Sequence, residues 1–196
     1  MGGISWEKSN FSIIQHFFNE RNITDKELII DVGCASGYFL SCFYKDINSG
    51  WQLYGIDISQ KAIIKGKKKY PFLKLFCKEG ENIGFPDNKF GVVVSYGSLE
   101  HFSDPLKALK EISRIMKKKG YFFIMIPTLG YYRTDTKKEG WYEDLDPLHQ
   151  KQWNYKRSTW EKKFDEADLT LFPISFSKKF GALKLGNFYI GQKRYN

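Results

Sequence analysis

Short apolar runs alternate with amphipathic segments over the first two thirds of the chain. The apolar runs have the length of buried strands, and the segments between them have helical spacing. Five strands are predicted here: Leu28–Val32, Gln52–Ile56, Leu73–Phe76, Phe90–Ser95 and Tyr121–Ile126. Strands that alternate with helices form a parallel sheet covered by helices. The pattern therefore predicts an α/β fold.

The helical segments carry recognisable start and stop signals. The segment Ser59–Lys69 opens on a serine that can cap a helix, and Asp104 with Pro105 opens a second helix that Gly120 ends. Before the first strand, apolar residues recur at helical spacing, which predicts a leading helix within residues 1–26.

The pattern changes after the fifth strand. Thr128–Tyr155 is rich in Gly, Tyr, Trp and charged residues without a clear period, so we expect a loop-rich excursion within an insertion at 128–160. The tail predicts a helix at Trp160–Ala167 and two more strands, Leu169–Phe176 and Asn187–Lys193. The seven strands fit one domain that spans residues 1–196.

Charge changes this picture little. The 196 residues include 31 Lys and Arg against 22 Asp and Glu, a formal net charge of +9. A basic balance can favour nucleic acid. Most of the excess, however, is lysine scattered over predicted helix faces, where it solvates the surface, so nucleic-acid binding is not favoured.

Cysteine and apolar patterns exclude several classes. The three cysteines form no CxxC pair and no histidine has metal-ligand spacing, so we expect neither disulfides nor a metal. The layout of a signal peptide is absent from the start, MGGISWEKSNFS, and no apolar run approaches the ~20 residues of a membrane span. We expect a cytoplasmic protein with no membrane partner.

The first strand runs into a glycine-containing loop, Asp31-Val32-Gly33-Cys34-Ala35-Ser36-Gly37. Glycine lets a backbone turn sharply and approach a ligand closely. The second strand runs on to Asp57, which places a carboxylate for the two hydroxyls of a ribose, and Ile58 can pack on an adenine face. These residues predict a nucleotide-type ligand.

The loop itself discriminates between two such ligands. A dinucleotide fingerprint, GxGxxG, would need glycine where Ala35 and Tyr38 stand. A fixed negative charge at Asp31 would repel a pyrophosphate but suits the ammonium group of a methionine moiety. An NAD-dependent oxidoreductase is therefore disfavoured.

The loop resembles the DxGxGxG loop of class I S-adenosylmethionine-dependent methyltransferases, in particular the methyltransferase type 11 and ubiquinone-pathway-like group. Residues 79–86 and 90–94 are similar to the GDAExLPF and FDVV segments of that family. Residues 99–105 match its LEHxxDP run, and residues 109–127 resemble its LxExxRxLKPGGxxxxxxP block. The resemblance implies a doubly wound, Rossmann-like seven-stranded sheet whose last strand is antiparallel.

The resemblance also implies S-adenosylmethionine as the cofactor and assigns residues to it. The assigned positions run from the methionine part through the ribose and adenine to the mouth of the methyl-transfer pocket. They are Asp31, Gly33, Cys34, Gly37, Asp57, Ile58, Glu79, Gly80, Glu81 and Tyr96. Glu79 stands where the family usually has Asp.

A hydroxyl acceptor would profit from a general base, and the candidates are Glu100, His101 and His149. His149 is preferred, because a histidine in a binding loop has fewer structural duties. The ubiquinone-pathway O-methyltransferases place a Glu three residues before the Glu-His pair, which allows a divalent metal. Gly97 stands at that position here, so no metal is expected.

The aromatic residues of the excursion are candidates for a lid over the acceptor, with Arg133 and His149 as polar anchors. They are Tyr131, Tyr132, Trp141, Tyr142, Trp153 and Tyr155. We expect methyl transfer to oxygen or nitrogen of a small molecule, such as a sugar, an aromatic metabolite or a natural product. The alternatives are an RNA (tRNA) methyltransferase or a non-catalytic S-adenosylmethionine-binding partner protein; the oligomeric state stays open.

Overall fold

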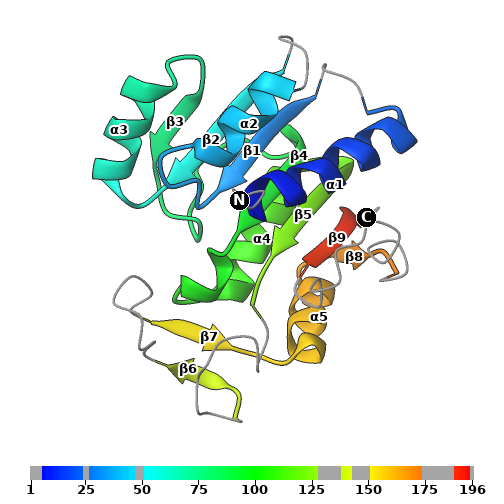
Figure 1. The fold of residues 1–196 in the computed structure, drawn as a ribbon. Coiled ribbons are helices and arrows are strands. Elements are labelled where there is room, and N and C mark those ends of the chain that lie inside the picture. The colour runs from blue at the N-terminus through cyan, green and yellow to red at the C-terminus, as the bar shows by residue number, and fades with distance from the viewer. Residues whose placement is uncertain are drawn as a thin grey trace, which may run out of the picture.

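The computed structural model describes residues 6–23, 27–46, 51–127, 138–142, 151–173 and 188–194. Seven of its strands form one sheet (Figure 1). In spatial order they are β3 (Lys74–Cys77), β2 (Gln52–Asp57), β1 (Leu28–Val32), β4 (Phe90–Tyr96), β5 (Met116–Met125), β9 (Phe188–Lys193) and β8 (Leu169–Leu171).

The direction of the strands confirms the predicted fold class. The strands β1 to β5 are parallel, and β9 runs antiparallel to both of its neighbours, β5 and β8. From β1 the chain first builds outward through β2 to β3, then returns to β4 and builds the other way. Ligands of such sheets bind where the order reverses, outside the carboxyl ends of the strands, here beside β1 and β4.

Helices cover both faces of the sheet. Apolar side chains of α1 (Trp6–Arg21), α2 (Tyr38–Asp46) and α3 (Gln60–Lys69) pack on one face, and those of α4 (Pro105–Ile115) and α5 (Arg157–Glu166) on the other. Alternate residues of each central strand enter the two cores: Val92 and Val94 face the first, and Val93 the second. The α/β sandwich predicted from the alternating pattern is confirmed.

Two predicted helix starts are present in atomic detail. The Ser59 side chain accepts a hydrogen bond from the Ala62 N–H at 3.2 Å at the start of α3. The Asp104 carboxylate accepts from the Lys107 N–H at 3.0 Å, and Pro105 occupies the first turn of α4, where its missing N–H costs nothing.

The prediction that Gly120 ends the second of these helices is wrong. The helix α4 ends at Ile115, and Met116 already has extended backbone angles and pairs with Phe90 at the start of β4. The register then jumps, because Val92 pairs with Tyr121, so the residues between form a bulge in which Lys119 has φ of 63°. Met116 is fully buried in the core in this position, whereas the lysines that follow it would gain no burial from a further helical turn.

The last third follows the prediction in outline. The described part of the excursion contains an antiparallel pair, β6 (Gly140–Tyr142) and β7 (Gln152–Asn154), which the irregular pattern does not predict. The helix α5 begins three residues before the predicted start at Trp160. The strand β8 ends at Leu171, two residues before Pro173, whereas the sequence predicts a strand to Phe176; residues 174–187 lie outside the described part.

Candidate functional site

A cavity of about 680 Å³ lies at the carboxyl ends of β1 to β4, where the strand order reverses. Its wall comes from the turns that follow these strands. The lining residues are Gly33, Ala35, Ile56, Asp57, Ile58, Lys78, Glu79, Gly80, Glu81, Tyr96, Gly97, Ser98, His101, Phe102 and Ser103. The cavity has the size of a site for a nucleotide-like molecule.

The turn after β1 depends on left-handed backbone conformations. Gly33, Ala35 and Gly37 have φ of 85°, 47° and 78°. A Cβ on Gly33 would overlap Ser98, whose Oγ donates to the Gly33 carbonyl oxygen at 3.1 Å. A Cβ on Gly37 would lie 2.8 Å from Leu73 Cδ1. Backbone angles and close protein neighbours therefore both require glycine here.

The carboxylate of Asp57 is fixed at the end of β2. Its Oδ2 accepts from the Ala35 N–H and its Oδ1 from the Ser59 N–H, both at 2.8 Å. These two bonds join the turn after β1 to the start of α3. Each oxygen keeps a second lone pair, so the half-buried group can still accept hydrogen bonds from the two hydroxyls of a ribose.

Asp31 lies behind the cavity wall, with only 2% of its surface exposed. Burial, and secondly the charge of Asp57, raise the pKa of Asp31 to about 8. Its Oδ1 has no hydrogen-bond partner among the described residues. A buried carboxylate without a partner is costly unless a cation neutralises it, so this position suits a positively charged ligand group.

The turn after β3 forms the opposite wall. Ile58, which follows β2, lies next to this turn in the cavity lining with 73% of its surface exposed, which leaves it available to an adenine face. A Cβ on Gly80 would overlap the Phe102 ring, so the backbone of this turn packs directly on that ring. Glu81 accepts a hydrogen bond from the Asp104 N–H at 3.1 Å, and Glu79 is exposed.

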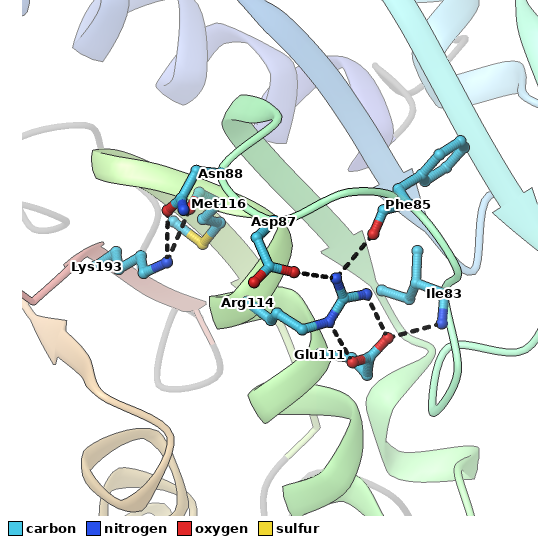
Figure 2. Close-up of polar contacts among 8 residues, drawn as sticks. All are labelled: Ile83, Phe85, Asp87, Asn88, Glu111, Arg114, Met116 and Lys193. Atoms are coloured by element: carbon cyan, nitrogen blue, oxygen red, sulfur yellow. Dashed lines mark hydrogen bonds and ion pairs between the residues drawn. The ribbon is translucent and has the colours of Figure 1, made fainter.

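The helix α4 holds the rest of this loop in place (Figure 2). Glu111 accepts from the Ile83 N–H at 2.9 Å and binds Arg114 at 2.6 Å through Nε. Arg114 also donates to the Phe85 carbonyl oxygen at 2.8 Å and to the Asp87 carboxylate. Figure 2 shows these groups converging from the loop and the helix, so the pocket wall is braced by two side chains of one helix face.

Two candidate bases lie in the short 3₁₀ helix η1 (Leu99–His101) after β4. The Nδ1 of His101 lies 2.7 Å from the Lys151 carbonyl oxygen, which can only accept. In the neutral ring Nδ1 therefore carries the proton, and the basic lone pair is on Nε2. Since His101 lines the cavity and the peptide carbonyl of Lys151 orients its ring, the histidine can take a proton from a molecule bound there.

Glu100 lies beside this histidine but is almost fully buried, with 1% of its surface exposed. Its Oε1 is 3.9 Å from His101 Nε2, and its Oε2 has no hydrogen-bond partner within the described ranges. Burial raises the pKa of Glu100 to about 8. His101 therefore has a buried, weakly acidic carboxyl group, that of Glu100, next to its ring.

Tyr96 ends β4 and completes the wall next to Asp31. Burial, and secondly the charge of Asp31, raise the pKa of its phenol well above the ordinary value. The ring packs on Phe39 of α2 at 4.2 Å and on Phe188 of β9 at 5.7 Å between ring centroids. Tyr96 therefore offers a neutral aromatic surface to the cavity.

Residues 30–124 match the family described as the methyltransferase domain. The matched segment runs from the middle of β1 into β5 and contains every wall residue described above. The chain carries a class I methyltransferase domain. A demethylmenaquinone methyltransferase of Staphylococcus aureus (strain MRSA252) is 26% identical to it over 183 residues, which cover 80% of this chain and 74% of that protein.

Solved structures are similar to this methyltransferase over nearly its whole length. An S-adenosylmethionine-dependent methyltransferase from Clostridium acetobutylicum ATCC 824 has a TM-score of 0.75 at 16% identity, covering 96% of this chain and 92% of that one. The [4+2]-cyclase SpnF has a TM-score of 0.72 at 14% identity, covering 97% and 82%. The second likeness shows that this fold also carries a different reaction.

The cofactor of the methyltransferase is S-adenosylmethionine, and the site has groups that fit it. The unpartnered Asp31 carboxylate suits the ammonium group of the methionine moiety, and the two oxygens of Asp57 suit the ribose. The turn at Gly33 leaves the wall open between them. Within the described residues, no group of His, Cys, Asp and Glu side chains converges as a metal site would.

Most predicted site residues meet at this cavity. The exceptions among the described residues are Asp31, Cys34, Gly37 and Glu100, which do not line the cavity; Cys34 is buried, and burial raises the pKa of its thiol. His149, the preferred base, lies outside the described residues. The wall also contains Lys78, Ser98 and Phe102, which the sequence reasoning did not select. Only the LEHxxDP run, which includes Phe102, gave a signal for one of them.

Proposed function

We propose that this methyltransferase transfers the methyl group of S-adenosylmethionine to a hydroxyl-bearing, quinone-like ring. The relatives named demethylmenaquinone methyltransferases support a ring of this kind. The observation that carries the proposal is the orientation of His101, whose Nδ1 is held by the Lys151 carbonyl oxygen beside the aromatic wall residues Tyr96 and Phe102. A flat aromatic acceptor can pack on these rings while its hydroxyl approaches His101.

The bound cofactor supplies an electrophilic sulfonium methyl group, so the protein mainly has to position and activate the acceptor. His101 accepts the acceptor hydroxyl proton at Nε2 as the nucleophile forms. The resulting imidazolium lies close to the Glu100 carboxyl group, whose Oε1 is 3.9 Å from Nε2 and stabilises that charge electrostatically. A deprotonated ring hydroxyl is nucleophilic at its oxygen and at adjacent ring carbons, so one base serves either methylation site.

His101→Gln tests this role. The glutamine side chain can still hydrogen-bond but cannot accept a proton, so we expect kcat to fall by about 10²–10⁴-fold. Affinity for S-adenosylhomocysteine, measured by calorimetry, should stay within about twofold. The matched control is His16→Gln, a histidine on α1 that forms an exposed pair with Glu20 at 2.9 Å.

The acceptor class is tested with labelled S-adenosylmethionine and three kinds of acceptor: a demethylated quinol, a sugar that contains no phenol, and tRNA. Transfer to the quinol alone supports the proposal. Transfer only to tRNA, together with strong salt dependence of its binding, would instead favour the RNA methyltransferase that the net charge of +9 suggests. Unchanged turnover in His101→Gln would remove this residue as the base and leave His149 as the remaining histidine candidate.

A further inference from the structure

The charged side chains at one end of the sheet are all lysines. Residues 60–78 form α3, the following turn and the edge strand β3, and they contain no Asp or Glu. Figure 1 shows α3 and β3 together at the end of the sheet opposite to β8 and β9. The lysines of this run are Lys61, Lys65, Lys67, Lys68, Lys69, Lys74 and Lys78.

The outer face of α3 mixes these lysines with a large aliphatic side chain. Ile64 is 59% exposed, although its neighbour Ile63 is buried in the core. Lys61, Lys67 and Lys68 stand three before, three after and four after Ile64, so they surround it on the helix surface. An exposed isoleucine between lysines combines an apolar side chain that can enter a lipid interface with charges that attract anionic lipids.

Further apolar groups continue this surface at both ends of the helix. Ile58, one residue before the Ser59 cap, is largely exposed and also forms the edge of the cofactor cavity. Phe72, three residues after α3, is exposed and stacks on the exposed Tyr44 of α2 with 3.9 Å between ring centroids. The apolar groups therefore follow α3 from the cavity edge to its far end.

The charges of this face are not compensated locally. Within the described part of the chain, none of Lys61, Lys65, Lys67 and Lys68 forms an ion pair, whereas Arg114 on α4 and Arg157 on α5 each bind a carboxylate of their own helix. The sequence alone favours a merely solvated surface for these lysines. Their unpaired state and the exposed Ile64 favour a surface that attracts a polyanion.

We propose that this surface, formed by Ile58, Lys61, Ile64, Lys65, Lys68 and Phe72, docks on a bilayer of anionic phospholipids. Lysines bind the phosphate layer, while Ile64 and its apolar neighbours enter the interface. A nucleic acid fits less well, because residues 60–78 contain no Arg and isoleucine cannot stack on a base.

Docking would bring the cavity edge at Ile58 close to the bilayer surface. A lipid-soluble acceptor would then be concentrated at the surface to which the protein is bound. This consequence rests on the proposed function, but docking itself does not, since it can be measured with neither cofactor nor acceptor present.

The test is flotation of the purified protein with vesicles. We expect binding to phosphatidylcholine vesicles that contain phosphatidylglycerol, little binding to pure phosphatidylcholine, and loss of binding at high salt. The double variant Lys61→Gln/Lys68→Gln should bind about 30-fold more weakly, because each lysine near an anionic surface contributes about fivefold. Ile64→Ser should also weaken binding, through loss of the inserted side chain.

The matched control is Lys110→Gln/Lys162→Gln, which removes the same charge from exposed positions on α4 and α5, on the other face of the sheet. It should bind vesicles nearly as well as the unchanged protein, and thermal unfolding of all variants should agree. Equal loss in both double variants, or no preference for the anionic lipid, would overturn the proposal. So would unchanged vesicle binding of Ile64→Ser together with tighter binding to RNA, which would assign the surface to nucleic acid.

Discussion

Ala35 holds a left-handed backbone conformation, with φ of 47°, in the turn that shapes the cofactor cavity. Its N–H donates to Asp57, which fixes that conformation. An alanine in this region is strained by about 1–2 kcal/mol, and glycine is not. We therefore expect Ala35→Gly to raise the free energy of unfolding by about 1 kcal/mol, reduced somewhat by the greater freedom of glycine in the unfolded chain.

Urea denaturation of Ala35→Gly measures this gain, and Ser36→Gly is the matched control. Ser36 is not among the described residues with positive φ, so its replacement should lower stability. If both variants lost stability, the turn would not be strained at Ala35. The family resemblance predicts glycine at position 35 but cannot show that alanine adopts the same angles, because the hydrogen bond from the Ala35 N–H to Asp57 is a contact between distant parts of the sequence.

At the level of elements, β7 is attached to the turn that carries the candidate base. The Trp153 indole N–H donates to the Phe102 carbonyl oxygen at 3.0 Å, and the Lys151 carbonyl oxygen accepts from His101. The excursion and the cavity wall are therefore joined by two hydrogen bonds. The sequence predicted a lid from aromatic composition alone; these two anchors depend on tertiary contacts that no local pattern encodes.

Trp153→Phe removes the indole N–H but keeps an aromatic ring. We expect the lost hydrogen bond, worth about 0.5–1.5 kcal/mol, to loosen β7 and to lower kcat/KM for the acceptor by about 2–10-fold. Affinity for S-adenosylhomocysteine, measured by calorimetry, should be nearly unchanged. Trp141→Phe is the control, because the described contact of Trp141 is the ring of Trp153 at 5.0 Å. Parallel losses of cofactor affinity and stability in Trp153→Phe would mark the pair β6 and β7 as part of the core.

For the whole molecule, two buried acids dominate the dependence of stability on pH. The pKa of Asp31 and that of Glu100 are raised by burial to about 8, from ordinary values of 3.8 and 4.5. Between these limits the folded protein keeps both protons while the unfolded chain releases them. The free energy of unfolding therefore falls as pH rises from about 4.5 to about 8, by up to about 1.4 kcal/mol per pH unit for each group, and then levels off.

Denaturation midpoints across this pH range check the sign, and Asp31→Asn should make the slope shallower by removing one of the two groups. The hydrogen bond with Arg114 lowers the pKa of Glu111. This group therefore makes the free energy of unfolding rise with pH, but only in more acidic solution. A ligand-free protein that became more stable between pH 5 and pH 8 would mean that these acids are ionised in the folded state.

The layers of the fold could be predicted from the sequence, but the spatial order of the strands could not. Alternating strand and helix signals predicted the layers, since burial on both faces of a parallel sheet leaves continuous apolar runs such as Phe90–Tyr96. Spatial order did not follow from that pattern: nothing local to Phe188–Lys193 says that this strand lies between β5 and β8. The family resemblance supplied the seven strands and the antiparallel last strand, but not this order.

The place of β9 also governs when the sheet can be completed as the chain leaves the ribosome. The strands β1 to β5 lie side by side and need no later residue to pair with one another. The strand β8, by contrast, has β9 as its partner and must wait until residues 188–193 have emerged. Until then an unpaired β8 and the uncovered edge of β5 are exposed, and that edge is open to pairing with other chains.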